Sequence, residues 1–487
     1  MEQRLATSKA ISLAFKARRR QPELISPAKP TPHELKFLSD IDDLIGLRFF
    51  IRTIFFYRHN PSSMIQAGNP DPVQVIRKAL AETLVYYYPF AGRLRERPNG
   101  KLMVECNAEG VLFVEADADV ALDDFGEDLR PPFPCSEELL FDAECNNPDL
   151  VERPFWISLG RCYATFQVVS SSSRGADIED CCDLPSDHVT RLKCGSFILG
   201  FNYNHVMCDG TGQRLFLRTL EEFARGSNAP SIPPVWDRHL LTAKVPPRVT
   251  PAHLVNVNEG VHDARDTTPH DPMVQRSFLF GPGEISAIRR LVPPDLRDRV
   301  TTFELLASFL WRCRTIALNC HPESETRLAI AVNARPFLRK PQLPPGYYGN
   351  AVTSPIAITT ASELSGRPLE FAVRLVQEAK SSVTEEWIRS MIDLLGTEGG
   401  RNATIRETYI VSDVRRIGRD EVDLGWGPPV YGGLVEGGVW EISWLIRRKN
   451  KTGETETSVQ VVLPEPAMER FAEELARVLE RDESTSR

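Results

Sequence analysis

The sequence predicts an α/β fold in two halves, and two observations carry this prediction. Strand-like and helix-like patterns are mixed along the chain without internal repeats. In addition, the stretch ARGSNAPSIPPVWDRHLLTAKVPPRVTPAH (224–253) is rich in proline and has no sustained hydrophobic period. We therefore expect a first domain at 1–225, a crossover linker at 226–250 and a second domain at 251–487, which suits a chain of 487 residues.

Three patterns define the elements expected in the first half. Residues 49–57, FFIRTIFFY, are typical of a strand. Residues 72–87 predict a helix with one stripe made of Val73, Ile76, Leu80, Thr83 and Leu84. Residues 100–117 resemble a β-hairpin. We expect the helix to cover a sheet that contains these strands.

The second half supplies a capped helix and a closing hairpin. Thr301 and Glu304 match a T-x-x-E capping box, which predicts a helix over 301–318. An apolar strand at 327–333 and a loop at 344–350 follow. Further elements are predicted near the C-terminus: strands at 439–448 and 457–463 around the turn Asn450 to Gly453, then a helix opened by Pro464 and Pro466.

Composition excludes several classes of protein. The net charge is -8 and no long basic tract occurs beyond Arg18 to Arg20, so nucleic acid is not expected as a partner. Ten cysteines without C-x-x-C spacing predict reduced thiols and neither a disulfide framework nor a zinc module. No stretch approaches the ~18 apolar residues of a membrane span. We expect a cytoplasmic protein; the basic first twenty residues leave an organelle-transit segment open as an alternative to a first strand.

The most informative segment is GSFILGFNYNHVMCDGTGQRLFLRTLEEF (195–223). Alternating residues from Phe197 to His205 share one face of a strand, which ends at a glycine-rich turn before a helical pattern. His205 and Asp209 thus bracket a junction from which side chains can project into a cleft. Histidine is the residue type suited to removing a proton from an alcohol near neutral pH. The alternative is a hydrogen-bonded structural histidine.

Other catalytic classes find less support. A metal site is not expected, because His205 and Asp209 lack a further cluster of ligands. A serine-hydrolase elbow G-x-S-x-G is absent from the sequence. A second unusual segment is EVDLGWGPPVYGG (421–433), in which five residues include a carboxylate, Asp423, an aromatic side chain, Trp426, and two glycines, Gly425 and Gly427. We interpret it as a structural turn around a buried tryptophan.

Together, HVMCDG (205–210) and DLGWG (423–427) resemble the paired His-x-x-x-Asp-Gly and Asp-Phe-Gly-Trp-Gly motifs of the plant BAHD acyltransferases. The segments at 13–32, 86–120, 345–352 and 411–427 are similar to that family as well, above all to its benzyl alcohol benzoyltransferase and alcohol acyltransferase subgroup. The resemblance implies two chloramphenicol-acetyltransferase-like domains with an active-site channel between them. It also implies a monomer with no metal and no permanently bound cofactor, which uses acyl-CoA as co-substrate and a small-molecule alcohol as acceptor.

Residue roles follow from the same resemblance. His205 would be the general base, and Asp209 would hold its loop through an arginine, for which Arg335 is the candidate. Gly210 would give the substrate room, and Ser412 and Asp413 would line the site. Asp423, Gly425, Trp426 and Gly427 would shape the domain junction near the CoA channel rather than react. The donor that stabilises the oxyanion is not identified by the sequence.

Three features depart from the family pattern. Leu424 replaces the usual aromatic residue, a loss of volume that we expect to cost stability but to leave the base in place. Arg419 stands where the subgroup usually has an aromatic side chain. Residues 149–188 are predicted to form an atypical insertion, because CDLPSDH before Val189 lacks the character of a buried strand.

The function predicted is transfer of an acetyl or benzoyl group from CoA to a benzyl, aliphatic or terpenoid alcohol, without a covalent enzyme intermediate. Two alternatives remain. The first is transfer to an amine, and the second is a catalytically impaired relative that only binds CoA esters.

Overall fold

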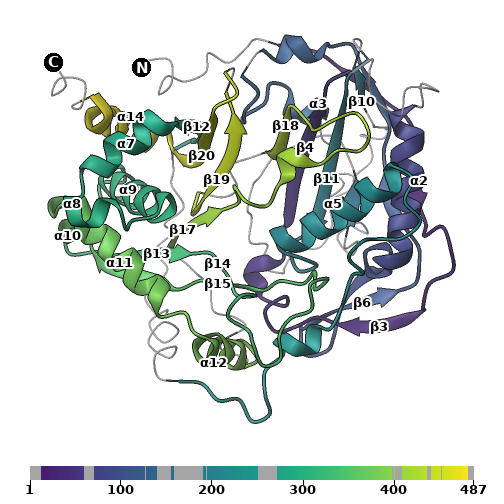
Figure 1. Ribbon diagram of the computed structural model, residues 1–487, viewed down its shortest axis with the longest axis horizontal. Coiled ribbons are helices and arrows are strands. Elements are labelled where there is room, and N and C mark those ends of the chain that lie inside the picture. The colour runs from purple at the N-terminus through teal and green to yellow at the C-terminus, as the bar shows by residue number, and fades with distance from the viewer. Residues whose placement is uncertain are drawn as a thin grey trace, which may run out of the picture.

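The computed structural model describes residues 13–59, 71–126, 128–139, 155–157, 190–192, 195–250, 271–397, 400, 408–435, 440–450 and 452–480. Within these residues the chain forms two main sheets whose helices lie on opposite outer sides of the molecule (Figure 1). The α/β fold predicted from the sequence is confirmed.

The first sheet contains nine described strands. Its centre is the antiparallel pair β4 and β11, which run side by side over eight residues each. On the far side of β4 lies β18, a strand from the second half of the sequence that pairs with the first sheet. The strands are β1 (Ala17–Arg19), β2 (Glu23–Ile25), β4 (Phe50–Tyr57), β7 (Val111–Phe113), β8 (Ala116–Ala118), β9 (Phe155–Ile157), β10 (Thr190–Leu192), β11 (Phe197–Asn204) and β18 (Tyr431–Leu434).

Two long helices cover the first sheet. Helix α2 (Pro72–Tyr86) buries the predicted stripe of Val73, Ile76, Leu80, Thr83 and Leu84, and it packs against α5 (Gly210–Ala224). Their apolar faces share one cluster with side chains of β4 and β11, including Phe55. Asp71 caps α2 by accepting a hydrogen bond from the Val73 N–H, which explains why the helix begins there.

The second sheet has the strand order β12-β20-β19-β17-β13-β16. Its helices bury Trp311 and the apolar side chains of alternate strand residues in a second cluster. The predicted helix begins at a complete capping box of Thr301 and Glu304, and the predicted C-terminal hairpin is present. The elements are β12 (Met273–Phe280), α7 (Pro282–Arg290), α8 (Pro294–Arg297), α9 (Thr302–Ala317), β13 (Glu325–Ile330), β16 (Ile356–Thr360), α10 (Ala361–Gly366), α11 (Leu369–Ser381), α12 (Glu385–Leu395), β17 (Thr408–Asp413), β19 (Ile442–Lys449), β20 (Thr455–Pro464) and α14 (Glu465–Glu480).

The hairpin predicted at 100–117 is wrong. Its first strand, β6 (Leu102–Cys106), lies between β3 (Glu34–Phe37) and β5 (Arg93–Glu96) in a small sheet, whereas β7 pairs with β2 and β9 in the first sheet. Ala108 and Gly110 adopt positive φ between them, and this turn sends the chain from one sheet to the other. The buried strand β7 is hydrogen-bonded on both of its edges, to β2 and to β9. Neither of these two partners is β6, the strand that precedes it in the sequence.

The stretch predicted as a linker, 226–250, is anchored at several points. Val235 bridges to Tyr347, and the N–H groups of Lys244 and Arg248 donate to the carboxylate of Asp393. Arg238 lies fully within the protein between the two halves. The segment therefore contributes side chains to the region between the sheets.

Most of the segment predicted as an insertion, 149–188, lies outside the described residues. Its described part, Phe155–Ile157, is strand β9, which pairs with both β7 and β11. These three residues therefore belong to the first sheet.

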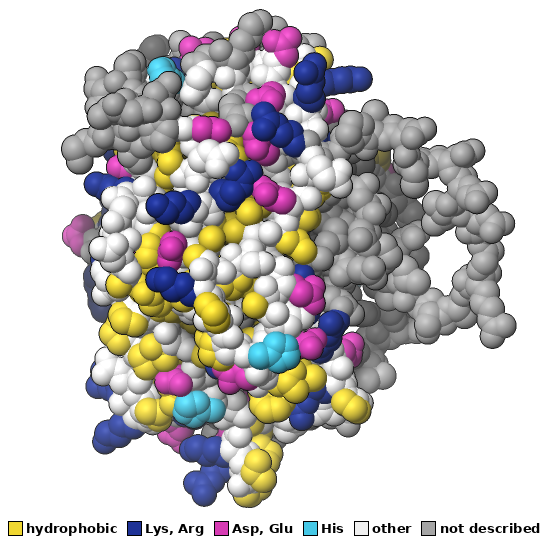
Figure 2. All heavy atoms as spheres, turned by 90° about the vertical axis from the view of Figure 1, so that its right-hand side faces the viewer, with side chains coloured by type: hydrophobic (Ala, Val, Ile, Leu, Met, Phe, Trp, Pro, Cys, Tyr) yellow, Lys and Arg dark blue, Asp and Glu magenta, His cyan; other side chains and the backbone are white. Residues whose placement is uncertain are grey.

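Two surface properties bear on partners. On the face shown in Figure 2, basic and acidic side chains are interspersed. Within the described parts of the chain, every helix is too short or too polar to cross a membrane.

Candidate active site

His205 follows directly after the buried strand β11 and is held by its backbone. Its N–H donates to the Phe49 carbonyl at 2.8 Å, and its own carbonyl accepts from the Asn350 side chain at 2.8 Å. The Phe49 ring meets the imidazole edge-on, with ring centroids 5.4 Å apart. Backbone and ring contacts thus hold His205 in one place at the end of the strand.

The environment of His205 keeps the imidazole neutral. Burial lowers the pKa of His205, and its own backbone, the Asp209 carboxylate and the Asn350 side chain only partly offset this effect. Atom Nδ1 is buried and has no hydrogen-bond partner among the described residues, while the residue as a whole is half-buried. A neutral imidazole keeps a lone pair on one ring nitrogen, and this nitrogen can accept a proton.

Asp209 organises the loop that follows His205. It caps α5 by accepting from the Gly212 N–H at 2.9 Å, and it accepts from the Ala351 N–H at 3.0 Å. Arg335 donates to both carboxylate oxygens, at 2.7 and 3.1 Å, so the structure brings together the pair suggested by the sequence. Burial alone would raise the pKa of Asp209, but Arg335 and the two N–H donors hold that pKa below its usual range. The carboxylate is therefore charged and engaged in holding the loop.

A second buried network, which the sequence did not predict, supports the site from behind. Asp42 accepts from Arg238 at 2.8 Å and from the backbone and side-chain N–H groups of Asn350 at 2.9 and 2.8 Å. Arg238 also donates to the Met207 carbonyl at 2.7 Å and lies over the Trp236 ring. The signal in the sequence was the acidic run at 40–43, which lies beside apolar residues. This network ties the linker, an N-terminal loop and the 344–350 loop to the HVMCDG turn.

Two glycines at the start of α5 permit close approaches. A Cβ at Gly212 would collide with the backbone carbonyl of Tyr348, so this position is where the helix meets the 344–350 loop. A Cβ at Gly210 would instead meet the end of the Ile417 side chain and lie 3.7 Å from Nη2 of Arg419. The lack of a side chain at Gly210 thus lets Ile417, from the segment that follows β17, pack against the HVMCDG turn.

The DLGWG loop lies at the opposite end of β11. Asp423 accepts from the N–H groups of Gly425 and Gly427, both at 2.8 Å, and both glycines have positive φ. The Trp426 ring packs edge-on against Phe197, which is eight residues before His205 and so about 26 Å away along an extended strand. Leu424 is fully buried in the first cluster. The arrangement gives this loop a packing role.

Ser412 and Asp413 lie at the end of β17 in the second sheet. Tyr409 and Val411 point into the second apolar cluster, under the helices of the second sheet. Because side chains alternate along a strand, Ser412 faces the opposite side of the sheet. Its partner on the neighbouring strand, Trp444, packs there against the first cluster. The Asp413 carboxylate is bound by Arg415 at 2.8 and 2.7 Å. Ser412 is therefore turned toward the first domain, whereas Asp413 is already paired.

The structure thus places the imidazole of His205 at the end of a central strand of a two-sheet α/β fold, on a loop that is tied to the second half of the chain through Arg335 and Asn350. Comparisons with known proteins show which class of protein has this fold. The model of the Transferase family matches residues 15–159 and 181–478, so the chain belongs to this family, that of the BAHD acyltransferases. The unmatched residues 160–180 fall inside the segment predicted as an insertion.

Relatives extend over nearly the whole chain. Benzyl alcohol O-benzoyltransferase of Petunia hybrida is 50% identical over 96% of this chain and 95% of its own length. (Z)-3-hexen-1-ol acetyltransferase of Arabidopsis thaliana is 50% identical over 98% of both chains. The crystal structure of F. graminearum TRI101 complexed with coenzyme A and deoxynivalenol has the same fold, with a TM-score of 0.65 at 15% identity over 90% of this chain and 96% of that one. The family, the fold and the enzyme class, an acyltransferase, are confirmed.

Proposed function

We propose that this enzyme transfers an acyl group from acyl-CoA to the hydroxyl group of a small alcohol, with His205 as general base. The single observation that carries the proposal is the position of the His205 imidazole at the end of β11, where its backbone is fixed by Phe49 and Asn350; burial, which lowers its pKa, favours the neutral form. An alcohol attacks a thioester slowly until its proton is being removed, and a neutral imidazole supplies that base.

The same residue completes the reaction. Nε2 takes the hydroxyl proton as the alcohol oxygen bonds to the thioester carbonyl carbon, and the resulting imidazolium donates this proton to the CoA sulfur as the C–S bond breaks. Asp209 acts as a positioning residue, since both of its oxygens are used by Arg335 and by N–H groups of the loop. Its charge stabilises the imidazolium from within the loop.

The relatives support the choice of substrates. Two of them are named for a benzoyl and an acetyl transfer to alcohols, and a protein of the same fold was solved with coenzyme A. We infer acyl-CoA as co-substrate, and a benzyl or aliphatic alcohol as acceptor. A cytoplasmic location and a monomeric state stay predictions.

The test is release of the CoA thiol from acetyl-CoA and benzoyl-CoA with benzyl alcohol, (Z)-3-hexen-1-ol and, for amine transfer, benzylamine. We compare the wild type with His205→Ala and with a control, His321→Ala, which changes an exposed histidine. Alcohol-dependent release lost only in His205→Ala supports the proposal. Release that survives in His205→Ala refutes the role of the base, and faster release with benzylamine favours amine transfer. CoA binding without turnover identifies the impaired relative.

A further inference from the structure

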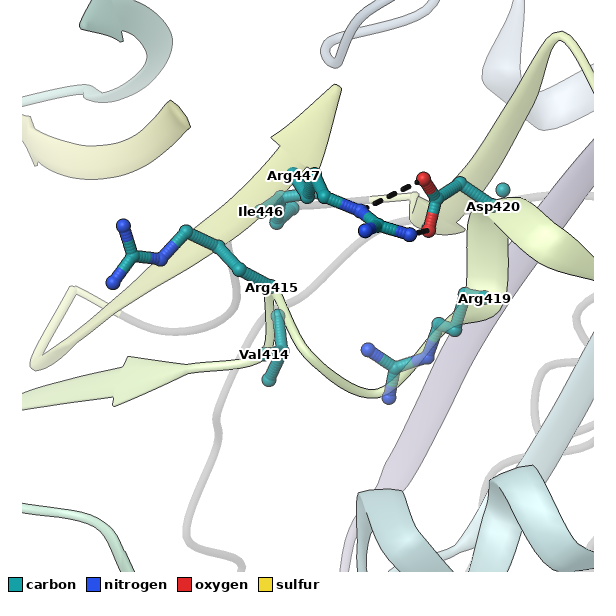
Figure 3. A pocket seen from close by; sticks show the side chains of 8 residues that line it. Val414, Arg415, Arg419, Asp420, Ile446 and Arg447 are labelled. Atoms are coloured by element: carbon teal, nitrogen blue, oxygen red, sulfur yellow. Dashed lines mark hydrogen bonds and ion pairs between the residues drawn. The ribbon is translucent and has the colours of Figure 1, made fainter. Parts of the chain in front are cut away.

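Arg419 is a buried cation without an acidic partner among the described residues. Arg419 is only 6% exposed, yet its guanidinium forms no ion pair with a carboxylate of the described residues. The nearby carboxylates are taken: Asp420 is bound by Arg447, with both distances 3.0 Å, and Asp413 by Arg415. Figure 3 shows the Arg419 guanidinium pointing away from the Asp420–Arg447 pair.

Neutral groups hold Arg419 in place. Its Nε donates to the Gln213 side chain at 2.8 Å, and Gln213, fully buried, donates in turn to Thr53 at 3.0 Å. Burial raises the pKa of the neighbouring Tyr203 hydroxyl, and the Arg419 guanidinium offsets part of this effect. These contacts orient the cation, but they bring no carboxylate of the described residues to its charge, and a buried charge without such a partner is costly.

The position of the guanidinium links it to the site of reaction. Its Nη2 would lie 3.7 Å from a Cβ at Gly210, on the turn that carries His205. Tyr203, whose hydroxyl this guanidinium influences, is also the neighbour of His205, with ring centroids 6.5 Å apart. The end of the Ile417 side chain also lies over Gly210, where it would overlap that Cβ. A molecule that reacts at Nε2 of His205 and extends over Gly210 therefore approaches Arg419 when the end of Ile417 moves aside.

We propose that Arg419 determines specificity by binding a carboxylate carried by one of the two substrates. An arginine offers a carboxylate two parallel N–H donors, and such a pair supplies the missing negative charge. The carboxylate comes either from the acceptor alcohol or from an acyl group that ends in a free acid. The inference rests on the proposed transfer reaction. It is tested first by kinetics, which require that reaction, and then by ligand binding, which does not.

The kinetic test uses pairs that differ only in charge. For the acceptor, 4-(hydroxymethyl)benzoate is compared with its methyl ester, both with benzoyl-CoA; for the donor, malonyl-CoA is compared with butyryl-CoA, both with benzyl alcohol. The readout is the ratio of kcat/KM for the charged member to that for the neutral member. We expect Arg419→Met to lower this ratio in one pair by about ten- to hundredfold, the value of a charge-assisted contact. The pair that responds identifies which substrate carries the acid.

Controls separate this effect from a general loss of function. Arg374→Met removes an exposed arginine on α11 and should leave both ratios unchanged. Arg419→Lys keeps the charge but loses the planar fork, so its ratio should fall between those of wild type and Arg419→Met. Ratios that Arg419→Met leaves as in wild type overturn the proposal, as does a wild-type preference for the neutral member of both pairs.

A binding measurement decides the matter if no acceptor supports turnover. The melting temperature of the wild type is recorded with benzoate and with benzamide, without acyl-CoA. Stabilisation by benzoate alone, absent in Arg419→Met, supports the site even where the transfer reaction fails. Equal effects of the two compounds on the wild type refute it, and this comparison does not depend on whether the variant folds.

Discussion

The ion pair between Asp209 and Arg335 offers the sharpest test of how the site is held. Its two side chains are 3% and 16% exposed and come from the two halves of the sequence. Arg335→Met removes the cation and keeps a side chain of similar reach. Asp209 would then be a buried carboxylate with only the N–H groups of Gly212 and Ala351 as donors.

The structure sets the expected size of the effect. Removing one partner of a buried ion pair costs about 3–5 kcal/mol, because an uncompensated charge stays behind. Asp209→Asn should cost less, about 2–3 kcal/mol, since asparagine also caps a helix and Arg335 can reach water. The unfolding free energy of the double variant should fall by about 2 kcal/mol less than the sum of the two single losses. In the double variant neither charged group is present, so no unpaired charge remains at the site.

Urea unfolding followed by tryptophan fluorescence measures these losses, and thiol release measures the turnover of each variant. Arg374→Met, which breaks an exposed helix pair with Glu370, serves as the control and should stay within about 0.5 kcal/mol of wild type. Additive losses in the double variant would refute the coupling. Full turnover in Arg335→Met would refute the claim that the pair positions His205.

Three further predictions test the loop, the DLGWG core and the base. Gly210→Ala should raise KM for bulky acceptors with little loss of stability, because the Ile417 side chain that it meets can move. Gly212→Ala should instead lower the melting temperature, because the new methyl group would collide with the backbone carbonyl of Tyr348. Equal effects of the two variants on stability would contradict this prediction. Leu424→Ala should cost about 3 kcal/mol of unfolding free energy through the cavity left in the core, with an unchanged KM. Burial lowers the pKa of His205, so activity, which needs the neutral form, should persist as pH falls and be lost only below about pH 6.5; an acid limb of kcat/KM above that value would be inconsistent with this environment.

Local patterns in the sequence were enough to predict most elements. The helix over 72–87, the capping box at Thr301 and the C-terminal hairpin all depend on residues within a few positions of one another. The same holds for the delivery of His205 to the end of a strand, which follows from the alternation from Phe197 onward. The resemblance of the HVMCDG and DLGWG motifs then indicated the family, which the relatives confirm.

Partners far apart in the sequence were predicted only in part. Arg335 was named as the partner of Asp209, but the network of Asp42, Arg238 and Asn350 was not. The hairpin at 100–117 failed for a related reason: strand pattern does not say which strand becomes the neighbour, and β6 and β7 pair in different sheets.

The sequence by itself determined the α/β class, the position of His205 at the end of a strand and the family, because periodicity and short motifs are properties of residues close together in the chain. Only the tertiary structure showed that β18 joins the first sheet and that Arg419, from the segment just before it, lies near Gly210 with no carboxylate of the described residues paired to it. These facts depend on how the two halves pack. Burial and charge compensation at a residue are set by side chains hundreds of positions away, and no local pattern contains that information.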